Sequence, residues 1–329
     1  MKIIISDFPE ALQRNVKYEE AYIKKMLPQA EVSIIEYHNK DLWLQQVRDA
    51  DALLTAFLKV GAEVMDAMPK LKCIVLNASG YDNIDTCAAS ERNIAVIPIQ
   101  EYCTQEVAEH TMALLLALER GLKQYTYTVD IEKRWQYHLT DNLRRIEGQT
   151  LGIVGFGKIG KAVARRAQAF GMKVLVCSSH ANKEEEEHYQ IRFVTKEELF
   201  AKSDVISNHM AMNKDNQKFF DQQAFEQMKK RPVFINVARG RAVDEKALEK
   251  ALEEGMIRGA GLDVLESEEP KLAACRLTNR NNVIITPHAA FYSEDSIKAL
   301  QEISCQNLCY FLQGEKQKVH WIVNEASLR

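Results

Sequence analysis

Short apolar runs alternate with amphipathic segments along the whole chain. In the first hundred residues the apolar runs are KIIISD, EVSIIEY, DALLTAF, KCIVLNA and IAVIPI, and helical patterns separate several of them. A second series begins at Leu151 and continues through KVLVC, DVISNHM, PVFINVA, GAGLDV and NVIITPH. Strands that alternate with helices are joined by crossover connections, which favours parallel sheets. The pattern therefore predicts an α/β protein with two series of strands.

The second series opens with three closely spaced glycines. A strand from Leu151 to Val154 leads directly into Gly155, Gly157 and Gly160, in the spacing G-x-G-x-x-G, and a helical pattern follows. In a dinucleotide site the first glycine permits a tight turn, the second lets the pyrophosphate approach the backbone, and the third lets helix and strand pack closely. Ordinary turns also use glycines, but the strand before and the helix after favour a nucleotide site. The predicted phosphate-binding turn consists of Gly155, Gly157, Lys158, Ile159 and Gly160.

The two strand series predict two domains, because 329 residues exceed what one core usually holds. We expect a flavodoxin-like substrate domain from residues 1–100 and 295–329. A Rossmann dinucleotide-binding domain, residues 101–294, would be inserted into it. A helix expected over 294–313 would return the chain to the first domain. The predicted fold class is thus two doubly wound parallel-sheet domains.

Composition excludes several classes of function. The net charge of −3 argues against a nucleic-acid-binding surface, which is normally basic. No apolar run approaches the roughly 20 residues of a membrane-spanning helix. The first residues, MKIIISDFPE, become charged at Asp7 and Glu10, which indicates a first strand and not a secretion signal. We therefore expect neither nucleic acid nor membrane as a partner.

The seven cysteines are scattered and form no C-x-x-C pair. Cys305 and Cys309 share a helical face, but no nearby histidine completes a set of metal ligands. We therefore expect no metal and a reduced, cytoplasmic protein.

A long apolar helix is expected over about 105–122, and a polar, aromatic segment follows over 123–149. This segment carries Tyr125, Tyr127, Trp135 and Tyr137. An exposed arm of this kind is suited to packing on a second subunit, although surface aromatic residues often have no such role. We expect a homodimer.

Three polar residues stand where strands of the second series should end. Arg239 follows PVFINVA, Glu268 follows GAGLDV, and His288 closes NVIITPH. In an open parallel sheet the ligand binds at the carboxyl ends of the strands. Taken singly, the histidine could be a capping residue and the arginine a surface cation. Downstream of a dinucleotide turn, the three together favour a catalytic site.

These side chains suit hydride transfer to a 2-keto acid. Arginine can bind the substrate carboxylate through two hydrogen bonds and polarise the adjacent carbonyl. Histidine can protonate the developing alkoxide and take the proton back in the reverse reaction. A glutamate beside the histidine favours the imidazolium form and fixes the tautomer.

The motifs GFGKIG, NVARG, GAGLDVLESEEP and TPHAAF occur in the order typical of the D-isomer-specific 2-hydroxyacid dehydrogenase family. YDNID at 81–85 and EVAEHTMALLLALER at 106–120 also resemble it, so the similarity covers nearly the whole chain. The resemblance, which extends to D-lactate dehydrogenases and hydroxypyruvate or glyoxylate reductases, implies reversible reduction of a small 2-keto acid to a D-2-hydroxy acid with NAD(P)H.

The resemblance also implies roles for the three polar residues. Arg239 would bind substrate, His288 would be the acid/base, and Glu268 would pair with the histidine. The family usually places this glutamate directly before a proline, which here would be Glu269. Counting from Asp263 favours Glu268, and we predict Glu268 because a strand sets the register more firmly than the loop behind it.

Similar enzymes bind the substrate carboxylate with backbone amides of the loop that here spans residues 77–81. Ser79 and Gly80 are the predicted contacts, and glycine suits an anion-binding nest of N–H groups. An ordinary turn is the alternative. Tyr102 occupies the place of an active-site tyrosine in D-lactate dehydrogenases, and a buried structural tyrosine is equally compatible with the sequence.

The expected cofactor is NAD(P), with a preference for NADP. NAD-selective sites usually carry an acidic residue about 20 positions after the glycines. Here the strand KVLVC ends in Ser178, Ser179 and His180, which can accept a 2′-phosphate, although the acidic run 184–187 lies close. The segment 208–213 also departs from the family's L-H-x-P-L-T. The further predicted cofactor contacts are Ser178, Ala238, Arg239, Asp263 and His288.

Phe57 and Leu58 lie where enzymes of phosphorylated substrates tend to carry basic residues, which favours a small or apolar 2-keto acid. The alternative is a non-catalytic NAD(H)-sensing binding protein of the corepressor type, which shares the fold and similar polar residues. Such proteins carry disordered tails, and no Pro/Ser-rich tail occurs here, so an enzyme is favoured.

Overall fold

The computed structural model describes residues 1–138 and 143–328 and divides into two compact units. The first unit consists of Met1–Tyr102 and Ser293–Arg329, and the second consists of Cys103–Tyr292. Each unit contains one sheet, and every strand pair in both sheets is parallel. The predicted fold class, two parallel-sheet α/β domains, is confirmed.

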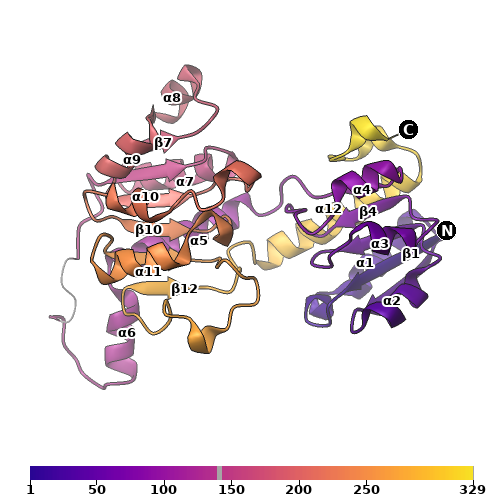
Figure 1. Ribbon diagram of the computed structural model, residues 1–329, viewed down its shortest axis with the longest axis horizontal. Helices are drawn as coiled ribbons and strands as arrows, with labels where there is room; N and C mark the ends of the chain where they lie inside the picture. Colours follow the sequence, from indigo (N-terminus) through magenta and orange to yellow (C-terminus); the bar gives the residue numbers. More distant parts are fainter. Residues whose placement is uncertain (139–142, 329) are drawn as a thin grey trace. The chain divides into compact units, whose positions relative to one another are not determined.

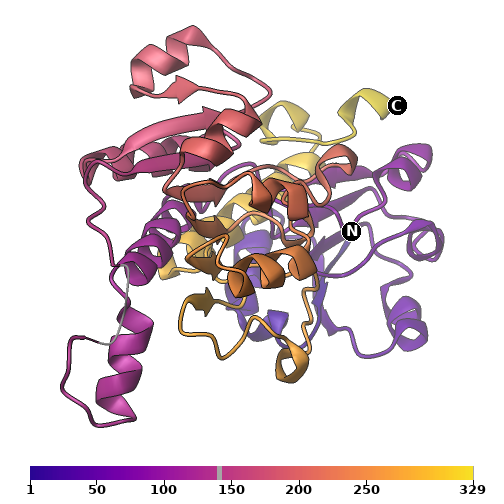
Figure 2. The same cartoon turned by 60° about the vertical axis from the view of Figure 1, so that its left-hand side comes forward.

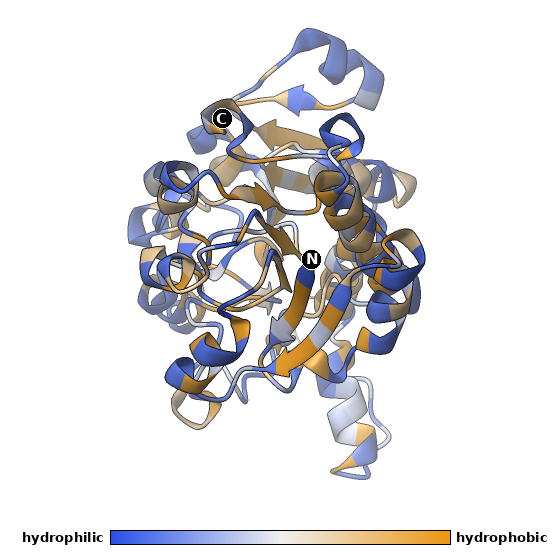
Figure 3. Ribbon diagram, turned by 90° about the vertical axis from the view of Figure 1, so that its right-hand side faces the viewer, coloured by the Kyte–Doolittle hydropathy of each residue, from blue (hydrophilic) through white to orange (hydrophobic). Residues whose placement is uncertain are grey.

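The sheet of the first unit has five strands in the order β2-β1-β3-β4-β5, which is the doubly wound order of flavodoxin-like folds. Its strands are β1 (Lys2–Asp7), β2 (Glu31–Glu36), β3 (Ala52–Thr55), β4 (Cys73–Leu76) and β5 (Ala95–Ile97). The central strands are short and almost wholly apolar because both of their faces are covered. Figure 3 shows their hydrophobic character.

Apolar side chains alternate between the two faces of this sheet. Ile4 and Leu53 belong to one buried cluster, whereas Ile5 and Leu54 belong to the other. The helices of this unit are α1 (Val16–Met26), α2 (Lys40–Val47), α3 (Ala62–Asp66), α4 (Thr86–Glu91) and α12 (Glu294–Leu312). Helix α12 packs against α1, β3 and β4, so the C-terminal segment is part of the first unit (Figure 1).

The sheet of the second unit has seven strands in the order β12-β11-β10-β9-β6-β7-β8. Counted within the unit, this is the Rossmann order 3-2-1-4-5-6 with one strand added. Its strands are β6 (Thr150–Val154), β7 (Lys173–Cys177), β8 (Arg192–Phe193), β9 (Val205–Asn208), β10 (Val233–Asn236), β11 (Gly259–Leu262) and β12 (Val283–Ile285). The chain reverses direction across the sheet between β6 and β9, where ligands bind in such folds.

The helices of the second unit cover both faces of its sheet, except α6 (Leu122–Asp130), which extends away from it (Figure 2). They are α5 (Thr104–Glu119), α6, α7 (Lys158–Ala169), α8 (Lys183–Tyr189), α9 (Lys196–Lys202), α10 (Gln222–Glu226) and α11 (Glu245–Glu253). Helix α5 packs against α7, β10 and β11, which explains its apolar composition. No helix in the described parts of the chain has the length and hydrophobicity to span a membrane.

The helix predicted over about 105–122 ends earlier than expected. Gly121 takes a left-handed conformation with φ of 61°, and the chain restarts there as α6. Helix α6 and the segment after it extend away from the sheet of their own unit (Figure 2). Trp135 and Tyr137, which follow α6, are 93% and 75% exposed. The predicted arm over 123–149 therefore begins with a helix, and its residues 139–142 lie outside the described residues.

Candidate active site

The glycine turn joins β6 to α7, and its three glycines have different physical requirements. Gly155 has φ of 90°, and a Cβ there would lie 2.7 Å from the backbone nitrogen of Met210. A Cβ on Gly160 would lie 2.5 Å from the carbonyl oxygen of Gly155. A Cβ on Gly157 would meet nothing within 4 Å. Gly155 and Gly160 are thus required by the fold itself, whereas Gly157 leaves open space beside the backbone.

That open space lies at the start of α7. Gly157 is the N-cap residue, and no side chain caps the helix there. The N–H groups of the first helical turn have no partners within their own helix, and they carry the positive end of the helix dipole. An anionic group beside bare backbone at Gly157 would satisfy them. The residues present therefore fit the pyrophosphate of a dinucleotide.

The end of β7 lies beside this turn, because Gly155 N donates to Cys177 O at 2.9 Å. The two residues that follow Cys177 are serines, and His180 folds back on them. His180 N donates to Ser178 Oγ at 3.3 Å, and the His180 ring lies 3.0 Å from Ser179 Oγ. The strand thus ends in hydroxyl and imidazole groups, with no carboxylate among residues 178–180.

His288 and Glu268 lie in contact. The Nδ1 atom of His288 is 2.8 Å from Glu268 Oε2, while Glu269 bonds its backbone N–H to Ser267 Oγ. His288 adopts φ of 51°, a conformation uncommon for side chains with a Cβ. Its N–H donates to Asp263 O at 2.7 Å, which helps to hold this conformation. Strained residues of this kind concentrate at functional sites.

Asp263, at the end of β11, organises the loop that carries His288. Its side chain is buried and accepts from Thr286 Oγ1 at 2.5 Å, Ala289 N at 2.8 Å and Ala290 N at 2.9 Å. His110, on α5, approaches Thr286 Oγ1 at 2.9 Å. The Asp263 carboxylate therefore bonds the segment on both sides of His288 and fixes where that residue stands.

Arg239 follows β10 and is half-buried. Its Nη1 donates to the carbonyl oxygen of Ala238 at 2.9 Å, and its own carbonyl oxygen accepts from Asn236 Nδ2 at 3.0 Å. The hydrogen bond to His288 holds the pKa of Glu268 below its usual value, and the positive charges of His288, Arg239 and Arg241 act in the same direction. Arginine, glutamate and histidine are thus electrically coupled at the carboxyl ends of β10, β11 and β12.

Two polar residues near this edge, Asn208 and His209, were not predicted as site residues. Asn208 Nδ2 donates to Asn236 Oδ1 at 3.0 Å, which links the ends of β9 and β10. His209 is half-buried, its backbone lies against Gly155 of the glycine turn, and burial of its ring lowers its pKa to about 3. Its Nε2 lies 2.8 Å from Ser207 Oγ. The sequence signal was the polar run Ser207–His209 at the end of an otherwise apolar strand.

The predicted substrate-binding residues Ser79, Gly80 and Tyr102 belong to the first unit, whereas Arg239 and His288 belong to the second. Ser79 is exposed and Gly80 is half-exposed, both in the loop directly after β4. Tyr102 is the last residue of the first unit before the chain enters the second.

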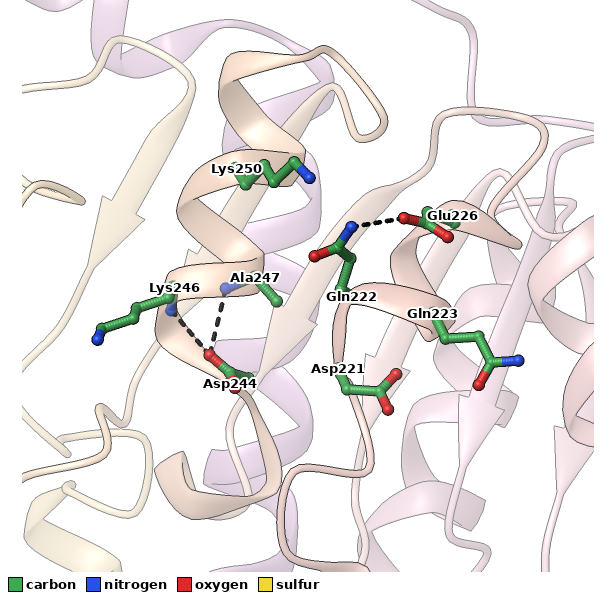
Figure 4. Close-up of a pocket in the computed structure, with 8 residues that line it drawn as sticks. All are labelled: Asp221, Gln222, Gln223, Glu226, Asp244, Lys246, Ala247 and Lys250. Carbon is green, nitrogen blue, oxygen red and sulfur yellow. Dashed lines mark hydrogen bonds between the residues drawn. The ribbon is translucent and has the colours of Figure 1, made fainter.

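A surface cleft of about 590 Å³ lies between α10 and α11 (Figure 4). Its lining is polar, but its side chains bond one another or cap the helices. Gln222 Nε2 donates to Glu226 Oε1 at 2.7 Å, and Asp244 Oδ1 accepts from the N–H groups of Lys246 and Ala247. None of the predicted site residues lines this cleft, and we assign it no role.

Comparison with known proteins identifies the family. Residues 112–290 match the family model for the NAD-binding domain of D-isomer specific 2-hydroxyacid dehydrogenases. The chain is 36% identical over 310 residues to a glyoxylate reductase of Korarchaeum cryptofilum, which covers 89% of this chain and 93% of the relative.

Solved structures agree over the same length. A D-lactate dehydrogenase of Aquifex aeolicus, complexed with NAD and lactic acid, has a TM-score of 0.86 at 28% identity, covering 98% of this chain and 99% of the other. An acyclic imino acid reductase, Bsp5, in complex with NADPH and D-Arg, has a TM-score of 0.83 at 28% identity, covering 98% and 100%. The chain belongs to the D-isomer-specific 2-hydroxyacid dehydrogenase family.

Proposed function

We propose that the protein reduces a small 2-keto acid to a D-2-hydroxy acid with NAD(P)H, reversibly. Membership of the family makes it an NAD(P)-dependent oxidoreductase. The observation that carries the proposal is the contact of His288 with Glu268, at the sheet edge where Arg239 also stands. In this proposal the first unit is the substrate domain and the second unit is the dinucleotide-binding domain.

His288 is the proposed acid/base. The Glu268 carboxylate bonds Nδ1 and so fixes the tautomer and orientation of the ring, which leaves Nε2 as the atom that gives a proton to the carbonyl oxygen of the substrate. The bound nicotinamide supplies the hydride, which is chemistry of the cofactor and not of the side chains. In the oxidation direction His288 takes the proton back from the hydroxyl group.

Arg239 is the proposed substrate-binding cation. A guanidinium group can bind a carboxylate through two parallel hydrogen bonds, and its charge stabilises the negative oxygen that develops on the carbonyl. Asn236 and the Ala238 carbonyl hold the segment around Arg239 in place.

The proposal assigns the substrate carboxylate to the N–H groups of Ser79 and Gly80, and Tyr102 is a further proposed substrate contact. Phe57 follows β3 and is 56% exposed, so an apolar ring stands at this position of the neighbouring loop, and the exposed Lys59 lies two residues further on. These features favour a small, unphosphorylated 2-keto acid of the glyoxylate, hydroxypyruvate or pyruvate type.

The proposed cofactor preference is NADP(H). Its support is the set of hydroxyl and imidazole groups at the end of β7, where an acidic residue would repel a 2′-phosphate. Gly155, Gly157, Lys158, Ile159 and Gly160 would hold the pyrophosphate. The remaining proposed contacts are Ser178, Ala238, Arg239, Asp263 and His288.

The protein is further proposed to be a cytoplasmic homodimer. Its seven cysteines are all free thiols, which suits a reducing compartment. Helix α6 and the segment after it expose several large apolar side chains: Leu122, Tyr127, Val129, Ile131, Trp135 and Tyr137. Such a patch on an extended arm favours contact with a second copy of the chain.

The decisive experiment is a panel of 2-keto acids assayed with NADH and with NADPH, in which the absorbance of the reduced nicotinamide is followed. We expect turnover of small keto acids and a higher kcat/KM with NADPH. Tight binding of either coenzyme without turnover of any acid would contradict the proposed activity. It would favour the NAD(H)-sensing binding protein instead.

A further inference from the structure

A network of buried polar side chains surrounds one carboxylate of the first unit. Glu19, on α1, has no exposed surface. Its carboxylate accepts hydrogen bonds from three side chains: Arg14, through Nε at 2.8 Å and Nη2 at 3.4 Å, Gln301 Nε2 at 3.0 Å and Asn77 Nδ2 at 3.1 Å. Ser304, on α12, completes the network because its Oγ donates to Asn77 Oδ1.

Packing of α1 against α12 does not require this network. The two helices already share an apolar interface that contains Ile23, Cys305 and Leu308. Removing a carboxylate from water is costly, and well-packed apolar side chains often stabilise such a position equally well or better. We therefore look for a role of the network other than stabilising the packing of the two helices. The residue that it bonds outside these helices indicates that role.

Asn77 is the member of the network that lies outside the helices. It is the first residue after β4 and the first residue of the loop 77–81. Its side chain is buried, and both of its polar atoms are engaged, Nδ2 by Glu19 and Oδ1 by Ser304. The amide plane of Asn77 is thus fixed by two different helices.

The backbone at the start of the loop is fixed as well. Asn77 N donates to Thr55 O at 2.8 Å, and the carbonyl oxygen of Ala78 accepts from Ile99 N at 2.9 Å. Side chain and backbone together set the direction in which the chain leaves β4. The next two residues, Ser79 and Gly80, are solvent-accessible.

A second buried carboxylate holds the neighbouring loop in the same manner. Asp7, at the end of β1, accepts from Ala56 N at 2.6 Å and from Phe57 N at 3.2 Å. Burial raises the pKa of Asp7, and these hydrogen bonds and the charge of Arg14 oppose that shift. Arg14 pairs with Glu19 and its charge also acts on Asp7, and the loops after β3 and β4 are fixed at the same edge of the sheet.

We propose that Asn77, held by Glu19 and Ser304, is a positioning residue for the carboxylate of the substrate. This inference rests on the proposed function, in which N–H groups of the loop 77–81 bind that carboxylate. An anion-binding nest works only when successive N–H groups point at one place. Asn77 does not touch the substrate but sets the orientation of the N–H groups at Ser79 and Gly80. A small displacement of these N–H groups would weaken their hydrogen bonds to the carboxylate.

The test compares Asn77→Ala with the wild-type enzyme in the full chain. Loss of the two side-chain bonds leaves polar groups of the network unpaired and releases the start of the loop, so KM for the keto acid should rise about tenfold. The kcat value and the Kd of NADPH, measured by its fluorescence, should change by less than about twofold, because the second unit is untouched. Ser304→Ala removes only one of the two bonds to the Asn77 side chain and should raise KM by about threefold.

Asn324→Ala is the matched control. Asn324 is also buried in the first unit and makes comparable bonds, accepting from Val96 N at 3.0 Å and donating to Ile94 O at 2.9 Å, but it supports β5 and not the loop. It should lower the melting temperature and leave KM unchanged.

A wild-type KM in folded Asn77→Ala, or an equal rise in Asn324→Ala, would overturn the proposal. If Asn77→Ala does not fold, the KM of Ser304→Ala is the test, and a wild-type KM in that variant would overturn the proposal. A wild-type protein that reduces no keto acid would instead refute the proposed function, so the two failures are distinct.

Discussion

His288 illustrates how single residues at the site are held in costly conformations. Its φ of 51° is unfavourable for a histidine, yet Asp263 bonds the chain on both sides of it and Glu268 bonds its ring. A backbone conformation of this kind persists only where the surroundings determine it. The sequence indicated the three strand-end residues but not the conformation, because the restraint on His288 comes from a different strand.

The two neighbouring glutamates offer a direct test of the pairing. Glu268→Gln keeps a hydrogen-bond partner for His288 but removes the charge, and we expect kcat/KM for keto-acid reduction to fall about 10- to 100-fold. Glu269→Gln changes the next residue, which bonds Ser267, and should leave the rate near that of the wild type. Equal effects of the two substitutions in steady-state kinetics would contradict the assignment of Glu268.

His209 should make the stability of the protein depend on pH. In the folded protein its pKa is about 3, whereas an exposed histidine in the unfolded chain titrates near 6.5. Between these values the unfolded chain binds the extra proton, so stability falls as the pH drops from 6.5 toward 3. At pH 5 this amounts to about 2 kcal/mol.

His209→Gln should therefore lose less stability than the wild type between pH 7 and pH 5, by about 2 kcal/mol in urea unfolding. His180→Gln, which changes an exposed histidine, is the control. Parallel pH profiles for wild type and His209→Gln would rule out this explanation.

At the scale of elements, apolar runs predicted the strands well. The strand predicted at 173–177 is β7, and the helix predicted at 294–313 is α12 with one residue fewer at its C-terminal end. Such runs are reliable because both sheets are covered on both faces. The break of the long helix at Gly121 was missed, because a continuous apolar pattern does not reveal a single left-handed residue.

Hydrogen bonds between side chains of different elements could not be predicted from the sequence. The bond between Asn208 and Asn236 joins residues that lie 28 positions apart, and only the pairing of β9 with β10 brings them together. The same holds for Asn77, whose partners come from α1 and α12.

The glycine turn yields a prediction that separates folding from binding. Gly157→Ala places a methyl group in open space at an ordinary φ of −80°, so the melting temperature should not change. The same methyl group stands where the pyrophosphate should approach, and the Kd of NADPH should rise at least about tenfold.

Gly160→Ala should behave in the opposite way. Its Cβ would lie 2.5 Å from the Gly155 carbonyl oxygen, and overpacking of this kind costs about 1–3 kcal/mol, seen as a lower melting temperature. Calorimetry measures the melting temperature of both variants, and titration with NADPH measures their coenzyme affinity. Unchanged coenzyme affinity in Gly157→Ala would exclude this turn as the phosphate site.

At the scale of the whole molecule, the exposed arm formed by α6 and the segment after it is proposed to hold two copies of the chain together as a dimer. We expect the wild-type protein to sediment as a dimer and Trp135→Glu to shift the equilibrium toward the monomer, since a charge at a buried interface is costly. Leu42 is 63% exposed on α2 of the first unit, so Leu42→Glu is the control and should leave the dimer intact. A wild-type monomer at assay concentrations would contradict the proposed role of the arm.

The central claim is that His288 transfers the proton that accompanies hydride transfer. The most direct measurement is single-turnover oxidation of bound NADPH by a small 2-keto acid, with His288→Ala compared to His38→Ala. His38 is a matched control because it also contacts a glutamate, Glu36, at 2.8 Å, but on the surface of the first unit. We predict that His288→Ala slows the reaction about 10²- to 10⁴-fold at unchanged coenzyme Kd, while His38→Ala does not. A wild-type rate in His288→Ala would contradict the account.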